Sequence, residues 1–232
     1  MNSRTLIRQL RDVAKHVKNA AEWKGSGFAV DGAKDHYVYE LLCYLTLCKE
    51  VAQHFKLKLV ARYDPKTKKP TANWPKSPGR KEKHSYFRLQ DQANHCHFEL
   101  CPGIKVADQY DQDRAADINL LRPSDSLHPT HTDVCGIWDA KYRVEATRRI
   151  EGPELFDFVL TYEVLKRPTP PEAWSNVVSS PFQRSGLLTN GQFSTEPLAL
   201  LVERGVQETA TYPDTPQTRP AEVKLPIARP AA

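Results

Sequence analysis

An acid and a lysine two residues apart interrupt the most strand-like segment of this chain. The segment, Gly136-Ile137-Trp138-Asp139-Ala140-Lys141-Tyr142, is rich in apolar and β-prone residues. Side chains two apart on a strand point to the same face, so Asp139 and Lys141 share one. Charge is costly in a core and is usually kept for a metal, a partner or chemistry, although a structural ion pair stays open. The same spacing recurs only where charges are solvated, at Glu22/Lys24, Asp64/Lys66 and Glu222/Lys224.

Two further acids lie in apolar surroundings. Asp117 is the single acid of the run 115–121, Ala-Ala-Asp-Ile-Asn-Leu-Leu, which predicts a short strand. The alternative for Asp117 is an ordinary acid at a strand edge. Glu40 lies within residues 33–54, whose apolar side chains recur at helical spacing nearly all round, so the helix is expected to be buried. Glu40 is therefore expected to face a cleft or a partner, unless it is a buried acid bonded to a tyrosine or an arginine.

The order of these features resembles the PD-(D/E)xK nuclease superfamily, the fold of many restriction endonucleases and resolvases. A helix with Glu40 precedes a strand with Asp117, which precedes the Asp139-Ala140-Lys141 strand and a further helix. The residue before the first aspartate is Ala116 rather than proline, a common departure.

A later segment extends the resemblance. Residues 186–196, Gly-Leu-Leu-Thr-Asn-Gly-Gln-Phe-Ser-Thr-Glu, are similar to the strand-turn-helix that follows the core in Mrr-like members. The resemblance covers about residues 33–206. It implies the α/β class, with a mixed central β-sheet flanked by helices and a restriction endonuclease-like αβββαβ core.

These residue types also indicate a chemistry. Asp117 and Asp139, with the backbone carbonyl of Ala140, would make a hard oxygen site suited to Mg²⁺ or Mn²⁺, which Glu40 would complete directly or through water. Such a metal polarises a phosphate and lowers the pKa of bound water. Lys141 would orient or deprotonate the attacking water and offset negative charge in the transition state. The expected catalytic residues are thus Glu40, Asp117, Asp139 and Lys141.

Positive charge is concentrated in one segment. The net charge is +5, but residues 56–83 hold ten Lys and Arg against Asp64 and Glu82, a local +8, so the remainder sums to −3. The loop 64–83 within it includes a tryptophan expected to be exposed, which suits phosphate contacts and base stacking. A solubilising loop is the alternative. The expected nucleic-acid-binding residues are Lys66, Lys68, Lys69, Trp74, Lys76, Arg80 and Lys81.

Periodicity divides the chain into three parts. Residues 1–27 predict an N-terminal amphipathic helix, which either packs on the core, as we expect, or forms a dimer contact. Residues 28–206 predict the nuclease-like domain, and residues 207–232, with five prolines, predict a flexible tail. Strands are expected at 56–63, 84–90, 95–101, 115–121, 134–143, 174–179 and 186–189, and helices at 3–23, 33–54, 151–166 and 195–205.

Composition is compatible with one intracellular catalytic domain. A chain of 232 residues with 40% hydrophobic content can bury one good core. Lacking a signal peptide or a long apolar run, it is expected in the cytoplasm, away from membranes. The five cysteines lack a C-x-x-C pair and are expected to be reduced. A zinc site is disfavoured, because alternation separates the candidate ligands and no second cluster has zinc spacing; the candidates are His95, Cys96, His97 and Cys101.

The sequence thus predicts a Mg²⁺-dependent endonuclease that acts on DNA, with RNA left open, and the resemblance to the superfamily implies a role in antiviral defence or DNA processing. The resemblance implies a possible homodimer, since many members of the superfamily cut duplexes as dimers with one site for each strand, and an ATPase or helicase is a possible partner. One alternative is a non-catalytic nucleic-acid-binding or scaffolding subunit of the same fold that docks to such a partner through the tail. The other is a binding module whose acids form ordinary salt bridges, which predicts no stabilisation by divalent ions.

Overall fold

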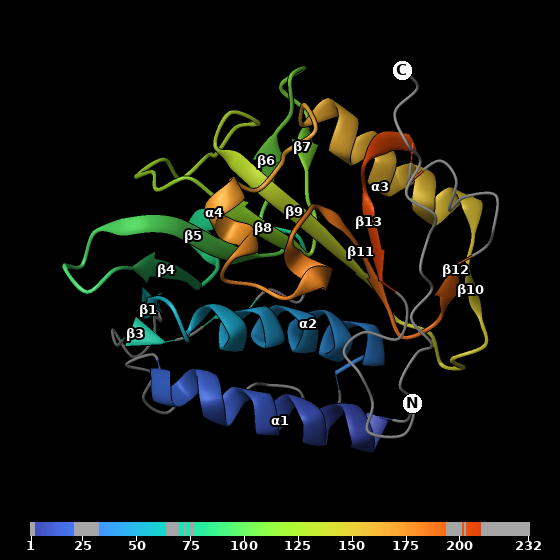
Figure 1. The fold of residues 1–232 in the computed structure, drawn as a ribbon, viewed down its shortest axis with the longest axis horizontal. Helices are drawn as coiled ribbons and strands as arrows, with labels where there is room; N and C mark the ends of the chain where they lie inside the picture. The colour runs from blue at the N-terminus through green and yellow to red at the C-terminus, as the bar shows by residue number, and fades with distance from the viewer. Residues whose placement is uncertain are drawn as a thin grey trace.

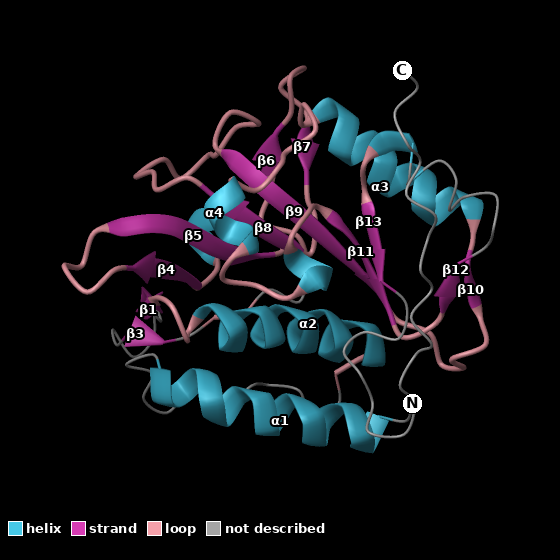
Figure 2. Cartoon of the chain, viewed as in Figure 1, coloured by secondary structure: helices cyan, strands magenta, loops and turns pink. Residues whose placement is uncertain are grey.

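The computed structural model describes residues 3–20, 33–63, 70–71, 73–74, 77–193, 201 and 203–209. Within these residues the fold is a mixed seven-stranded sheet in the order β1-β4-β5-β8-β9-β11-β13, with helices on both faces (Figure 1). The predicted α/β class with a mixed central sheet is therefore confirmed. Cartoon colouring shows the layers, with α1 and α2 on one side of the sheet and α3 on the other (Figure 2).

Two long helices form the N-terminal layer. α1 (Ser3–Ala20) buries Leu6, Leu10 and Val17 against α2 (Asp35–Val51), so the predicted helix packs on the core. α2 is buried on most of its surface, because it lies between α1 and the sheet. The uniform apolar pattern of α2 thus reflects two packing partners.

The first five strands of the sheet are antiparallel neighbours. They are β1 (Lys56–Val60), β4 (Tyr86–Gln90), β5 (Cys96–Pro102), β8 (Ile118–Leu121) and β9 (Val134–Lys141). The sheet then becomes parallel, as β11 (Gly186–Thr189) pairs with β9, and β13 (Gln207–Thr209) pairs with β11. Along the chain, β1 and β4 come between α2 and β5, and the succession β5, β8, β9, α3, β11 then follows the predicted order, so the sheet has two more strands after α2 than the predicted αβββαβ order.

The crossover from β9 to β11 contains α3 (Gly152–Val164). A capping box starts this helix, because the Glu151 side chain accepts from the backbone of Glu154 while the Glu154 side chain accepts from the backbone of Glu151. Its buried face packs in a cluster with Ile137 and Leu187. Small elements complete the fold: β2 (Arg62–Tyr63), β3 (Pro70–Thr71), η1 (Lys81–Lys83), β6 (Val106–Ala107), β7 (Asp113–Arg114), β10 (Arg149–Ile150), α4 (Glu172–Ser175), η2 (Ser180–Phe182) and β12 (Gln192–Phe193).

Two predicted elements are wrong. Residues 174–179 are not a strand, because α4 and a turn occupy them, and Trp174 and Val178 are buried at a spacing that also suits a helix. The predicted tail begins too early, because residues 207–209 form the edge strand β13. Of the predicted helix 195–205, residues 194–200 and 202 lie outside the described residues, as do residues 210–232 of the tail. None of the helices among the described residues is both long and apolar enough to span a bilayer.

Candidate functional site

Three elements bring the four predicted catalytic residues to one region. Glu40 lies on α2, Asp139 and Lys141 lie on β9, and Asp117 immediately precedes β8. Asp117 was expected inside a strand, but β8 begins at Ile118, which pairs with Trp138. The start of β8 therefore places Asp117 beside Asp139.

Hydrogen bonds fix the two aspartates against each other. The Asp117 backbone N–H donates to Asp139 Oδ1 at 3.2 Å, and the Ala140 N–H donates to Asp117 Oδ2 at 2.7 Å. The Asp117 carbonyl in turn accepts from the N–H of Gly103, which has φ of 50° in the turn after β5. Each aspartate is thus held by main-chain groups of a neighbouring segment, so the arrangement is rigid.

Lys141 completes the group on β9. Its Nζ lies 2.7 Å from Asp139 Oδ2, and both side chains keep some exposure, 26% for Lys141 and 14% for Asp139. The pair was predicted to share a face of one strand, and this contact confirms it. Because neither side chain is fully buried, the pair remains accessible to a ligand.

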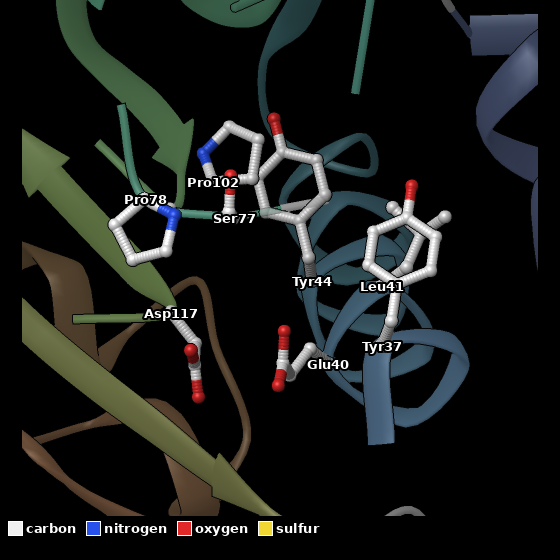
Figure 3. Close-up of a pocket in the computed structure, with 9 residues that line it drawn as sticks. Tyr37, Glu40, Leu41, Tyr44, Ser77, Pro78, Pro102 and Asp117 are labelled. Atoms are coloured by element: carbon white, nitrogen blue, oxygen red, sulfur yellow. The ribbon is translucent and has the colours of Figure 1, made fainter. Parts of the chain in front are cut away.

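Glu40 faces the aspartates across a narrow pocket. In Figure 3 its carboxylate and that of Asp117 point toward one another from α2 and from the start of β8. The pocket has a volume of ≈ 40 Å³, room for a few water molecules. Its lining consists of Tyr37, Glu40, Leu41, Tyr44, Ser77, Pro78, Pro102, Gly103 and Asp117.

The proximity of these charges perturbs their proton equilibria. Burial and then the charge of Asp139 raise the pKa of Glu40 to about 7. Burial, Asp139 and Glu40 together raise the pKa of Asp117. Burial works to lower the pKa of Lys141, but the charges of Asp139 and Asp117 outweigh it, so this pKa is raised. The surroundings therefore favour the protonated forms of Glu40 and Asp117 and the cationic form of Lys141.

The donors of this site suit a hard cation. Carboxylate and carbonyl oxygens are the ligands that Mg²⁺ and Mn²⁺ prefer. In the described part of the chain, no three His, Cys, Asp or Glu side chains are gathered in a metal-holding arrangement, so the site is not a ready-made cage. The chemistry of the donor set fits such a cation, whereas the described carboxylates are not gathered closely enough to hold one as they stand.

Comparison with known proteins adds nothing to this geometry. The chain matches no family model, no curated protein and no solved structure.

The expected nucleic-acid contacts are only partly placed. Lys66, Lys68, Lys69 and Lys76 lie outside the described residues, and Arg80 is exposed. The expected exposure of Trp74 is wrong, because the residue is only 7% exposed and its ring packs against Tyr44 and Phe87.

The prediction for Lys81 is also wrong. Its side chain is 1% exposed and pairs with the buried Glu99, which also accepts from Arg88 Nε at 2.9 Å. Lys81 Nζ donates further to the carbonyls of Ser124 at 3.1 Å and Ser126 at 3.4 Å. This lysine ties the end of the basic loop to the sheet, because a buried ammonium requires an anion and acceptors.

The disfavoured zinc ligands have other partners. The rings of His95 and His97 both bond to Asp91 Oδ2, at 3.3 and 3.1 Å. Cys101 is fully buried.

Sequence reasoning missed the turn that supports Lys141. Thr189 pairs with Lys141 in the parallel part of the sheet, and its hydroxyl donates to the Lys141 carbonyl at 2.6 Å. Asn190 accepts the Arg143 N–H at 2.7 Å and donates to the Arg143 carbonyl at 2.6 Å. The polar Thr-Asn-Gly sequence at the end of a buried strand is the signal for this support.

Proposed function

We propose that this protein is a divalent-metal-dependent endonuclease of the PD-(D/E)xK, restriction endonuclease-like type that hydrolyses DNA phosphodiester bonds. The observation that carries the proposal is the convergence of Glu40, Asp117, Asp139 and Lys141 from α2, β8 and β9. Their residue types and their order along the chain agree with that chemistry, and so does the antiparallel pair β8 and β9 followed by α3 and the parallel strand β11.

The electrostatics of the site support a bound cation. Three carboxylates share a partly buried region, and Lys141 is, among the described residues, the cation that lowers the pKa of both Glu40 and Asp117. Like charges at close range raise one another's pKa, and a bound divalent cation offsets that repulsion. A purely structural cluster has no comparable reason to gather a third acid.

Asp117 and Asp139, with Glu40 nearby, would hold the metal, and the main-chain carbonyl of Ala140 is an additional donor. When bound, Mg²⁺ or Mn²⁺ supplies charge neutralisation at the phosphate and an acidified water. The protein contributes the fixed positions of the two aspartates, through the N–H groups of Ala140 and Asp117.

Lys141 acts as a cation in this proposal. Because its pKa is raised, it keeps its proton at neutral pH, which favours orientation of water and stabilisation of the developing negative charge over proton abstraction. Its carbonyl is bound by Thr189, so the strand that presents it is fixed at the neighbouring strand as well.

The surroundings favour a nucleic acid as the substrate. The basic segment 56–83 carries a local charge of +8, and its residues Ser77 and Pro78 line the pocket. The Gly79 N–H donates to the Gly103 carbonyl at 3.1 Å, so this segment is anchored beside Asp117. In this proposal the enzyme acts in the cytoplasm, in antiviral defence or DNA processing. It works as a homodimer or with an ATPase or helicase.

Plasmid cleavage tests the proposal. Purified protein is incubated with supercoiled plasmid, single-stranded DNA and RNA in Mg²⁺, Mn²⁺ or EDTA, alongside Asp139→Asn and Lys141→Met. Asp157→Asn and Lys15→Met, which alter exposed residues of the same types on α3 and α1, serve as controls. We expect metal-dependent cleavage that both site variants lose and both controls keep.

Two results would contradict the proposal. Cleavage that persists in Asp139→Asn would remove this site from consideration. Metal-independent binding of DNA without any cleavage would favour the non-catalytic subunit instead.

A further inference from the structure

The chain leaves the proposed site through a basic segment. Residues 143–149, Arg-Val-Glu-Ala-Thr-Arg-Arg, begin two positions after Lys141 and carry three arginines against Glu145, a net charge of +2. They connect β9 to β10 and lie beyond the end of β9 that carries the site (Figure 1). Residues 144–149 are all exposed.

The backbone of this segment is fixed at both ends. Asn190 binds the N–H and the carbonyl of Arg143, and the Gln192 N–H donates to the Arg148 carbonyl at 3.0 Å. Arg149 pairs with Gln192 in the parallel ladder of β10 and β12. The approach needs a glycine at position 191, because a Cβ there would lie 2.5 Å from the Arg148 carbonyl oxygen. The segment is therefore held in one place despite its exposure.

The three arginines differ in what they bind. Arg143 forms an ion pair with Glu154, so its charge is used within the fold. Among the described residues, nothing bonds to the guanidinium groups of Arg148 and Arg149. Each of these two exposed guanidiniums, carried on a held backbone, can take an anion, and its planar fork matches phosphate oxygens.

We propose that Arg148 and Arg149 form a phosphate-contacting arm that binds the nucleic-acid backbone next to the bond being hydrolysed. This inference rests on the proposed function. In a nucleic acid, the phosphates next to the scissile one are covalently linked to it. A nucleic-acid strand bound at Lys141 therefore brings further phosphates near residues 143–149. Contacts of this kind position a duplex without reading its sequence.

Salt-dependent binding tests the arm. A short fluorescent DNA duplex, and an RNA duplex of the same sequence, are titrated over a NaCl series in Mg²⁺ in an Asp139→Asn background, which keeps the DNA intact. Arg148→Gln/Arg149→Gln is compared with Arg4→Gln/Arg8→Gln, a matched pair of exposed arginines on α1. The wild-type background gives cleavage rates over a range of DNA concentrations.

Loss of two phosphate contacts should make the plot of log K against log salt concentration shallower by about 1.8, at about 0.9 for each contact with B-form DNA. Cleavage by the arm variant should need more DNA for half-saturation, with little change at saturation. The α1 variant should keep the parental slope and the parental half-saturation.

The outcomes separate the arm from the nuclease. If the wild type cleaves DNA but the arm variant shows the same slope of log K against log salt concentration as its parent, the arm alone is overturned. An equal loss in both double variants would also overturn it, since the effect would then be one of general charge. Absence of both binding and cleavage in the parent protein would remove the proposed function and the arm together.

Discussion

Replacement of Glu40 by glutamine should stabilise the metal-free protein at alkaline pH. The pKa of Glu40 is about 7 in the folded protein against an ordinary value of 4.5, and burial is the largest cause. Below pH 4.5 the carboxyl is protonated in both states and contributes no pH dependence. Between the two values only the folded state keeps the proton, so stability falls as pH rises, and above 7 the full cost is present.

The size of this cost follows from the two pKa values. A tenfold change in proton affinity is about 1.4 kcal/mol, so a rise of the pKa from 4.5 to about 7 corresponds to about 3 kcal/mol. For a domain of this size, that difference shifts the melting temperature by about 6–12 °C. The amide has nearly the same shape as the carboxylate, and within the described residues no hydrogen bond or ion pair to the Glu40 carboxylate is lost.

The assay is thermal and urea unfolding in EDTA across the pH range, for the wild type, Glu40→Gln and the exposed control Glu203→Gln. We expect Glu40→Gln to match the wild type at low pH and to exceed it by up to about 3 kcal/mol at pH 8, whereas Glu203→Gln follows the wild type throughout. Identical pH profiles for the wild type and Glu40→Gln would refute the reasoning, because they would mean that Glu40 is as well solvated in the folded state as in the unfolded state.

Three further predictions follow from the contacts described above. Saturating Mn²⁺, at about 100 times its dissociation constant, should raise the stability of the wild type by about 2.7 kcal/mol, and calorimetry should show that Asp117→Asn/Asp139→Asn abolishes the effect. Lys81→Met should cost about 3–5 kcal/mol, because Glu99 remains buried beside it, whereas Lys81→Met/Glu99→Leu should recover part of that loss in urea unfolding. Asn190→Ala should lower the stability by about 2–4 kcal/mol, because it leaves two main-chain groups of Arg143 unpaired, and plasmid cleavage should be slower. Unchanged stability in urea unfolding would contradict a supporting role of Asn190.

Strongly apolar segments of this sequence predict their own structure well. The helix at 33–54 and the strands at 134–143 and 186–189 agree with the structure because each is buried on most sides, which leaves a nearly continuous apolar run in the sequence. The position of Glu40, Asp139 and Lys141 within those elements followed directly. That these three residues lie close together depends on the tertiary structure, and here it agrees with the predicted order of helices and strands.

Elements stabilised by distant partners were not predictable in the same way. Trp74 lies in a polar, basic stretch, and only Tyr44 and Phe87 from other elements make it a core residue. Lys81 is indistinguishable from its basic neighbours until Glu99 on β5 faces it. β13 has a polar sequence and is a strand because its backbone bonds to the edge of β11. In each case the determining contact joins residues far apart along the chain.

The antiparallel pairing of β8 with β9 has a consequence for the folding reaction. These strands are consecutive in the chain, so Asp117 and Asp139 meet as soon as that local pairing forms, before the α3 crossover must close. Repulsion between the two acids then opposes an early step, and it grows when α2 brings in Glu40. The chain should fold more slowly as these acids ionise, and a divalent ion bound at the proposed site would then act on the rate of folding as well as on the final stability.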